Sequence, residues 1–453
     1  MPRPRSIPVL LLLILAACDG GASGPALDAK TTAVYSRIRA ALDAVPAISN
    51  HDHLHPSGRM PYADPTANGA AITLHSLWAG SYVTYNIDVP PWPADRSFGT
   101  WWKGARNCFD TVRAAGFYRY YLPAFRDLYG VDFETLTDEE AGELNSRIIA
   151  NHRDPEWVRR VIVTKANLEM VIVDPFWSRI EVRREDPFTV PLLNVHTVIH
   201  GSHPSRDSGS RNSPYEFAKS RGRQVRTFDD YLSAVDLIFK EAVAKGAVGI
   251  KSTQAYVRTL DFERVDRARA AEVFGIPPDR ITAREQKAFE DFMVWHLAAL
   301  AAAHDLPFQI HTGRGKPDGS NPMLLFDLIA GNPRTKFVLL HGGYPWIEDA
   351  AVLAQTHSNV WLDASWMPTL SYTVAKRALR EWLECVPASQ ILWGGDSVHP
   401  EGVYASTVLT RECLSDALAE KVVRGELREE QATAIGRMIL RENARALYSR
   451  LPE

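Results

Sequence analysis

Eight short apolar runs, bounded by turn-forming residues, constrain the fold of this chain more than any other feature of its sequence. Such runs are typical of strands that are buried on both faces, as in a parallel sheet. Stretches with helical spacing of apolar residues separate most of them, for example 228–245 and 282–304. This alternation predicts an α/β fold closed as a (β/α)8 TIM barrel. The eight runs cover residues 45–53, 169–174, 192–196, 248–252, 307–311, 337–341, 360–363 and 391–396.

Each run ends at an ionisable residue, although a buried apolar strand has no packing reason to contain one. In this barrel the carboxyl ends of all strands converge on one mouth, where active sites are built. We therefore predict a single polar funnel; the alternative is that strand ends meet water and simply tolerate polar residues. The terminal residues are His51 with His53, Asp174, His196, Lys251, His311, His341, Asp363 and Asp396.

Two long segments interrupt the strand–helix alternation. Residues 55–168 follow the first strand, are rich in aromatic residues and contain helical stretches such as 100–128 and 138–152. Because this insertion leaves from the mouth, we expect it to roof the site; a packed helical subdomain or a dimer face is the alternative. The Ser- and Arg-rich residues 201–226 predict a solvated loop, with a lid over an anionic substrate as the alternative. Residues 401–450 predict a C-terminal helical segment that closes the barrel.

The N-terminus carries a predicted export signal. Arg3 and Arg5 precede an apolar run at residues 7–17, which is too short to span a bilayer. The run ends Leu-Ala-Ala-Cys, which resembles a bacterial lipobox, so Cys18 is the predicted lipidated residue. An ordinary signal peptide cleaved a few residues later is the alternative. The lipobox resemblance further implies that Asp19, directly after the cysteine, favours retention at the periplasmic face of the inner membrane, with the outer membrane as the other destination.

The predicted organisation is a lipoprotein signal peptide (1–17), a flexible tether (18–31) and one barrel domain (32–453). With 51 Lys and Arg against 54 Asp and Glu, the net charge of −3 gives no reason to expect nucleic acid as a partner. The expected partners are a small-molecule substrate, the membrane through the lipid anchor, and a second copy of the chain if it forms a homo-oligomer. Three further cysteines lack Cys-x-x-Cys spacing and predict buried thiols: Cys108, Cys385 and Cys413.

A pair of histidines at the end of the first run predicts a metal site. His51 and His53 are two residues apart, so in an extended strand both imidazoles point the same way. The pair is a weak signal alone and gains weight from His311 and Asp396 at the ends of the fifth and eighth runs. Imidazoles with one carboxylate suit Zn²⁺, with Mn²⁺ or Fe²⁺ as alternatives. A competing register uses His53 and His55, but it would displace the inward apolar residues of the strand.

The order and spacing of seven blocks resemble the amidohydrolase superfamily, in the branch that includes the amidohydrolase-2 group, over roughly residues 44–450. The aromatic insertion is more similar to uronate-isomerase and glutamine-synthetase-fused relatives than to compact decarboxylases. Ser49 departs from the family, which usually has Asp two residues before the first histidine. The blocks are ISNHDH (48–53), GIKSTQAYVRTL (249–260), FQIHTGRG (308–315), FVLLHGGYPW (337–346), NVWLDAS (359–365), WGGDS (393–397) and ILRENARALY (439–448).

The resemblance implies that His51, His53, His311 and Asp396 bind one or two divalent metal ions. It also implies that Asp396 accepts a proton from the attacking water and returns it to the leaving group. His341 corresponds to the family histidine that contacts substrate or polarises the scissile carbonyl. We expect it to donate a hydrogen bond to the developing oxyanion.

Lys251 has two roles among similar proteins, and the sequence leaves both open. In some of them a lysine here is carboxylated and bridges two metal ions; in others the residue contacts the substrate. Tyr256 and Arg258 follow in the same loop and are predicted to bind substrate. An arginine there would hold a carboxylate through two hydrogen bonds, and a surface arginine is the alternative.

These expectations favour a metal-dependent hydrolase that cleaves a C–N bond of an amide or cyclic amide, or a related ester, with a metal-activated water. Non-oxidative decarboxylation, or isomerisation of a sugar acid, is the alternative chemistry on the same site. A third hypothesis is a non-catalytic, metal-stabilised lipoprotein that binds a ligand. We expect a small substrate that carries a carboxylate.

Overall fold

The computed structural model describes residue 30 and residues 32–175, 180–207 and 213–452. The predicted signal peptide, the lipidation site at Cys18 and nearly all of the tether lie outside the described residues. Among the helices of the described ranges, none is both long and apolar enough to cross a membrane.

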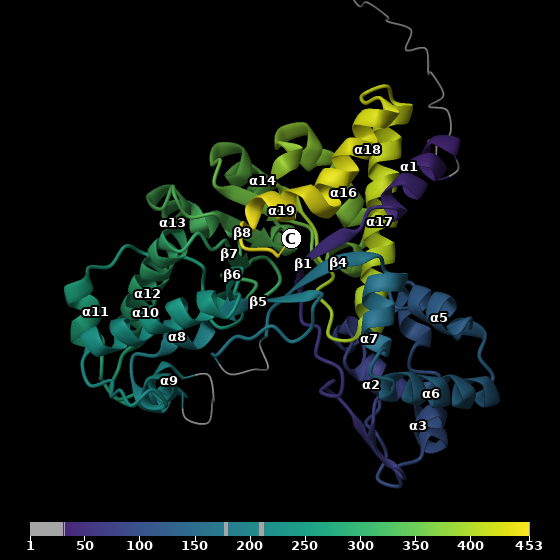
Figure 1. Cartoon of the computed structure of the whole chain (residues 1–453), viewed down its shortest axis with the longest axis horizontal. Helices are drawn as coiled ribbons and strands as arrows, with labels where there is room; N and C mark the ends of the chain where they lie inside the picture. Colours follow the sequence, from purple (N-terminus) through teal and green to yellow (C-terminus); the bar gives the residue numbers. More distant parts are fainter. Residues whose placement is uncertain (1–29, 31, 176–179, 208–212, 453) are drawn as a thin grey trace, which may run out of the picture.

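Eight parallel strands form one sheet whose spatial order follows the chain, β1-β4-β5-β6-β7-β8-β9-β10. The arrangement confirms the predicted (β/α)8 barrel (Figure 1). The third predicted run begins earlier than expected, and the eighth forms only a short strand before the chain turns. The strands are β1 (Ala47–Asp52), β4 (Leu168–Val173), β5 (Thr189–Asn194), β6 (Gly249–Ser252), β7 (Phe308–His311), β8 (Phe337–Leu340), β9 (Val360–Asp363) and β10 (Ile391–Leu392).

Backbone hydrogen bonds join the first strand to the segment that continues the last, and so close the barrel. Asn50 N donates to the Trp393 carbonyl and Asp396 N donates to the His51 carbonyl, each at 2.9 Å. The close approach needs Gly394, because a Cβ there would lie 2.7 Å from the His51 backbone nitrogen. Closure therefore carries Asp396 to the end of β1.

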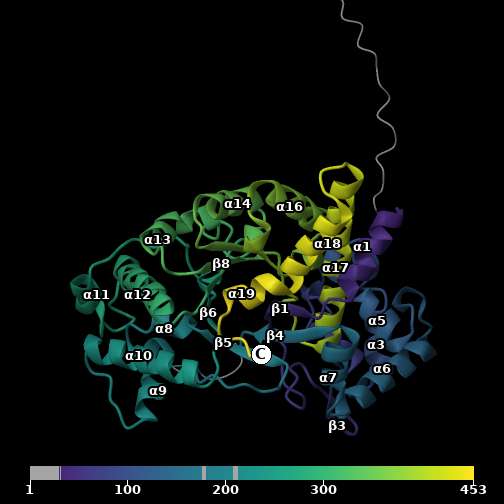
Figure 2. The ribbon, with the colours of Figure 1, turned by 45° about the horizontal axis from the view of Figure 1, so that its top comes forward.

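Alternate strand residues fill the barrel interior with a small apolar cluster. It includes Ile48, Ile172, Val338 and Leu392, and the C-terminal Tyr448 packs into it. The C-terminal helices lie beside the barrel together with the N-terminal helix, on the side opposite α10 and α12 (Figures 1 and 2). These helices are α1 (Ala33–Asp43), α17 (Pro400–Val423), α18 (Glu429–Arg437) and α19 (Asn443–Leu447), whereas the short α15 (Met367–Leu370) follows β9.

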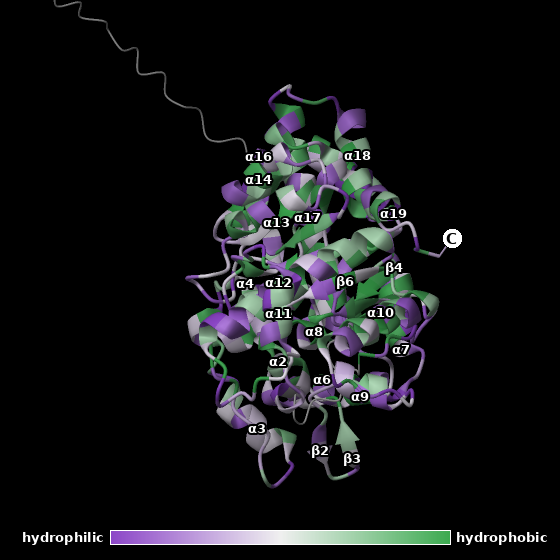
Figure 3. Ribbon diagram, turned by 90° about the vertical axis from the view of Figure 1, so that its left-hand side faces the viewer, coloured by the Kyte–Doolittle hydropathy of each residue, from purple (hydrophilic) through white to green (hydrophobic). Residues whose placement is uncertain are grey.

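Helices on the outside of the barrel bury their apolar faces against the strands and expose polar ones (Figure 3). Thr227 and Thr282 cap α10 and α12 through reciprocal hydrogen bonds with the third residue of each helix. Both helices fall where the apolar periodicity predicts them. The outer helices are α8 (His196–His200), α10 (Phe228–Ala244), α11 (Arg267–Val273), α12 (Ala283–Ala303), α13 (Phe326–Gly331), α14 (Ile347–Thr356) and α16 (Tyr372–Cys385).

The long insertion between β1 and β4 forms several short helices around an aromatic core. The buried Trp78 ring contacts the rings of Phe109, Tyr118 and Phe125. The single helical stretch expected over 100–128 is broken into shorter pieces. The insertion holds the hairpin β2 (Asp64–Thr66) and β3 (Gly69–Ala71), and the helices α2 (Leu74–Ala79), α3 (Phe98–Ala105), α4 (Gly116–Arg119), α5 (Leu122–Tyr129), α6 (Asp138–Arg153) and α7 (Trp157–Arg159).

The predicted loop at 201–226 is partly ordered by packing. Within its described part, α9 (Pro214–Lys219) contacts α10 and buries Phe217. Arg221 is paired with Glu241 at 2.7 Å. The Ser- and Arg-rich composition misses this packing because one buried aromatic residue is enough to dock a short helix.

Candidate metal centre

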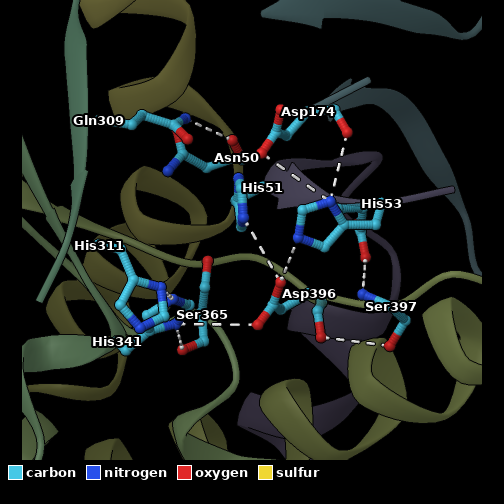
Figure 4. A network of polar contacts seen from close by, with 12 residues as sticks. Asn50, His51, His53, Asp174, Gln309, His311, His341, Ser365, Asp396 and Ser397 are labelled. Carbon is cyan, nitrogen blue, oxygen red and sulfur yellow. Dashed lines mark hydrogen bonds and ion pairs between the residues drawn. The ribbon is translucent and has the colours of Figure 1, made fainter. Parts of the chain in front are cut away.

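The structure brings His51, His53 and Asp396 together at the mouth of the barrel (Figure 4). Their ligand atoms lie within 4.8 Å of one another. Asp396 Oδ1 is 3.4 Å from His51 Nε2 and 3.3 Å from His53 Nε2. Two imidazoles and a carboxylate at this spacing suit a divalent transition-metal ion.

Local backbone geometry explains how a carboxylate reaches the two histidines. Asp396 has a left-handed backbone, with a φ of 54°, directly after two glycines. A Cβ on Gly395 would lie 2.6 Å from both Asp52 Oδ1 and Ser406 Oγ, so only glycine fits. Ser49, the departure from the family pattern, donates to Asp52 and accepts a hydrogen bond from Gly395 N at 3.1 Å. Ser49 thus supports the junction that presents Asp396.

The unsatisfied polar atoms of His51 fit a cation. His51 is fully buried, and neither of its ring nitrogens has a hydrogen-bond partner among the described residues. Buried polar atoms are rarely left unpaired. Burial also lowers the pKa of His51 well below its ordinary value, which favours the neutral imidazole that binds metals.

The proton that His53 shares with the Asp396 carboxylate lies where a metal cation would bind. His53 Nδ1 donates to the Asp174 carbonyl at 3.3 Å, which leaves Nε2 directed to the shared carboxylate. Burial opposes charge on His53, but the contact with Asp396 outweighs it and raises the pKa to about 9. Burial also opposes the Asp396 carboxylate, yet contacts with His51 and His53 hold its pKa well below its usual range. A cation at this position would displace the His53 proton.

His311 is not part of this group, which differs from the predicted set of four ligands. Its Nε2 donates to the Arg314 carbonyl at 2.9 Å, and its Nδ1 lies 2.9 Å from His341 Nε2. The turn at Gly313, with a φ of 76°, brings that carbonyl back over the ring. His341 lies between the two sets, because its Nδ1 is 3.2 Å from the Ser365 carbonyl and 3.9 Å from Asp396 Oδ2.

Lys251 is buried in the centre of the funnel. Its side-chain amine has no hydrogen-bond partner within the described ranges, and only 1% of the residue is exposed. Burial lowers its pKa to about 8, against the opposing charges of Asp174, Asp396 and Asp363. Asp363 itself accepts from the Ser365 backbone nitrogen at 2.7 Å and is held inside the barrel wall.

The two predicted substrate-binding residues differ from each other. Tyr256 is half exposed at the mouth, and its ring centroid is 4.3 Å from that of His311. Arg258 instead turns away: its guanidinium donates to Glu290 at 2.9 Å and to Asp291. With its charge neutralised by these two carboxylates of α12, Arg258 is a structural residue, which corrects the prediction that it holds a substrate carboxylate.

Tyrosines of the insertion line a cavity of about 180 Å³ that opens onto Asp396. The insertion therefore roofs the site as well as packing on itself. Burial and the nearby Asp396 charge raise the pKa of Tyr82 well above its ordinary value. The aromatic composition predicted a roof but could not say which rings face inward. The lining tyrosines are Tyr62, Tyr82, Tyr85, Tyr120 and Tyr121.

An eight-stranded parallel barrel with a His-His-Asp group at its mouth defines the class of metal-dependent (β/α)8 proteins. Residues 230–450 match the family model described as Amidohydrolase. This match covers just under half of the chain, and over that range the sequence is similar to the amidohydrolase family, as the blocks within it predict.

Known proteins similar to this chain include one fungal relative and two bacterial isomerases. Protein fluG of Emericella nidulans is 30% identical over 273 residues, which cover 55% of this chain but only 30% of that protein. The uronate isomerase of Thermotoga maritima has a TM-score of 0.72 at 15% identity, covering 92% of this chain and 97% of its own. The glucuronate isomerase of Caulobacter crescentus also has a TM-score of 0.72 at 15% identity, covering 95% and 96%. At these identities the two structures share the fold alone.

Proposed function

We propose that this protein is a metal-dependent hydrolase that cleaves a C–N bond of an amide or cyclic amide, or a related ester bond. One observation carries the proposal: His51, His53 and Asp396 converge on a common point, and the ring nitrogens of His51 are otherwise unpaired in the described structure. Three protein ligands leave room for water or substrate, as in catalytic rather than structural metal sites.

The residues of the chain divide the work of hydrolysis. A bound divalent cation would supply Lewis acidity, which makes water nucleophilic near neutral pH and polarises a substrate oxygen. Asp396, already charged at neutral pH, accepts the proton of the attacking water and returns it to the leaving group. His341 would donate a hydrogen bond to the developing oxyanion only if its Nε2 exchanged its present partner, His311 Nδ1, for the substrate oxygen.

We favour one ion, Zn²⁺, over two. The three ligands form a single group, and Lys251 makes no contact that would bridge to a second set. With a pKa near 8, Lys251 supplies an ammonium for a substrate carboxylate at neutral pH. Carboxylation of Lys251 remains the alternative: intact mass would then rise by one CO₂, and metal analysis would give two ions per chain.

Isomerisation of a sugar acid is the second candidate. The likeness to the two isomerases covers nearly the whole chain, including the roofing insertion, and so favours a similar way of enclosing a substrate. A mass-neutral conversion would support it, CO₂ release would support decarboxylation, and release of an amine or alcohol would support hydrolysis.

The test is metal analysis of the purified protein followed by a substrate screen with product identification by mass spectrometry. The panel contains N-acyl amino acids, small lactams, aromatic acids and uronic acids. The Asp396→Asn variant separates catalysis from binding, because a non-catalytic binding protein would keep its ligand affinity. Asp318→Asn, an exposed position, is the matched control.

We also propose that the chain is exported and anchored through Cys18 at the periplasmic face of the inner membrane. The basic start, the apolar run and the lipobox-like Leu-Ala-Ala-Cys support this proposal. Cys18→Ser should move the protein from the membrane fraction to a soluble or unprocessed form. Equal fractionation of the two forms would contradict it.

A further inference from the structure

Arg314 lies in the loop that follows β7, which ends at His311. Two glycines hold this loop close to its neighbours: a Cβ on Gly313 would lie 2.3 Å from the Tyr344 carbonyl, and one on Gly315 would lie 2.3 Å from the Ala255 carbonyl. Lys316 N also donates to the Ala255 carbonyl at 2.7 Å. The backbone that carries Arg314 is therefore tightly positioned.

The Arg314 guanidinium lies on an aromatic platform. Its central carbon is 4.1 Å from the ring centroid of Tyr85 and 5.8 Å from the centroids of Phe117 and Trp366. Tyr85 and Phe117 come from the insertion, and Trp366 follows β9. Aromatic faces hold a guanidinium by cation–π attraction without consuming the N–H donors in its plane.

No carboxylate in the described part of the chain pairs with Arg314, and its side chain is only partly buried. Arg258 differs in this respect, because Glu290 and Asp291 neutralise it. Free planar donors beside apolar rings match a carboxylate carried on an apolar or aromatic body.

Arg314 also lies next to the candidate metal centre. The Trp366 ring that supports it is 5.5 Å, centroid to centroid, from the His341 ring. Tyr256, whose ring contacts that of His311 at a tilt of 42°, is the half-exposed ring at the same mouth. A substrate whose reacting bond lies at Asp396 would thus pass between tyrosines to reach the guanidinium.

We propose that Arg314 determines specificity by binding an anionic group, a carboxylate, of a substrate with an apolar or aromatic body. The proposal rests on the proposed function for where the substrate reacts, but not for whether it binds. It transfers the carboxylate recognition predicted for Arg258 to an arginine whose donors are available.

A matched pair of probes, benzoate and benzamide, tests the proposal without turnover. Binding to the zinc-loaded protein and to the chelated protein is measured by ligand-observed NMR titration. We expect benzoate to bind at least about tenfold more tightly than benzamide in both forms. Arg314→Gln should reduce this preference to less than about twofold, and Arg314→Lys should retain only part of it, because an ammonium lacks the paired planar donors.

Lys316→Gln, which removes an exposed charge from the same loop, should leave the preference unchanged. The proposal is overturned if wild-type protein shows no preference or if Arg314→Gln keeps it, since the anion is then bound elsewhere, for example by the zinc or Lys251. Equal weakening of both probes would also overturn it and leave Arg314 a structural link between roof and barrel. If the probes behave as expected while the substrate screen finds no hydrolysis, the proposed reaction fails and the binding residue stands.

Discussion

Two clusters of buried ionisable side chains are built around carboxylates only a few residues apart in the chain, Asp396 and Glu401, and they differ in how their hydrogen bonds are arranged. Glu401 Oε1 accepts from Tyr129 at 2.7 Å, from His152 at 2.9 Å and from Trp157 at 3.0 Å. It ties α17 to the insertion. The metal group contains a similar mixture of histidine and carboxylate, yet the nitrogens of His51 lack such partners in the described structure.

The comparison teaches that burial of charge does not by itself mark a reactive site. In the Glu401 cluster three donors converge on Oε1 and make the carboxylate a structural anchor, although Oε2 has no partner in the described structure. Around Asp396, by contrast, ligand atoms of two histidines and the carboxylate lie within 4.8 Å of one another. Unsatisfied ring nitrogens that lie in a group of converging ligand atoms are therefore a better indicator of a ligand site than burial or a single unpaired oxygen.

The largest expected effect is on turnover. Asp396→Asn removes the proton acceptor and one ligand of the proposed ion, so turnover should fall at least about 10²-fold. The metal content measured by mass spectrometry should also fall below that of wild type. If Asp396→Asn kept full metal occupancy and unchanged turnover, Asp396 would be a structural carboxylate like Glu401, and the proposed difference between the two clusters would be wrong.

Glu401→Gln should act on stability instead. Burial opposes the Glu401 carboxylate, but the charge and hydrogen bond of His152 lower its pKa to about 2. The ordinary value is 4.5, so this carboxylate contributes about 3 kcal/mol to the free energy of unfolding above pH 4.5. That contribution is lost as the pH falls from about 4.5 through about 2.

Urea denaturation at pH 7 and at pH 3 measures this contribution, with exposed Glu430→Gln as control. We expect Glu401→Gln to be less stable at pH 7 and to show a flatter pH dependence, while its metal content stays at the wild-type level. A steep acid dependence that persists in Glu401→Gln would assign it to other carboxylates.

Removal of the metal ion should lower the free energy of unfolding by an amount similar to that expected for Glu401→Gln, but by acting on the metal group. At a free zinc concentration about 100-fold above its dissociation constant, the ion should stabilise the folded state by about 3 kcal/mol. Chelation should therefore lower the melting temperature of wild type and Glu401→Gln alike, and leave Asp396→Asn unchanged. An equal shift in all three would mean that the ion binds elsewhere.

The sequence predicts the strands and the convergence of three side chains well, because both depend on local pattern. Period-two alternation alone aligns His51 with His53, and parallel strands bring Asp396 to the same mouth. The partners of Arg258 lie on α12, more than 30 residues further along, and nothing local reveals them. The direction of His311 likewise depends on the turn at Gly313.

The smallest expected effect concerns Ser49, where the family usually has Asp. Ser49 contacts Asp52 and the Gly395 backbone but none of the three ligands, so it supports the group at one remove. Ser49→Ala should cost about 1 kcal/mol of unfolding free energy for the lost hydrogen bonds, with metal affinity changing less than about threefold. Groups that orient a ligand directly typically cost 10- to 100-fold in affinity when removed. A loss of that size in a zinc competition titration would mean that Ser49 orients Asp396 through Gly395. Ser49 would then belong to the groups that position the metal ligands, and would not be a purely structural residue.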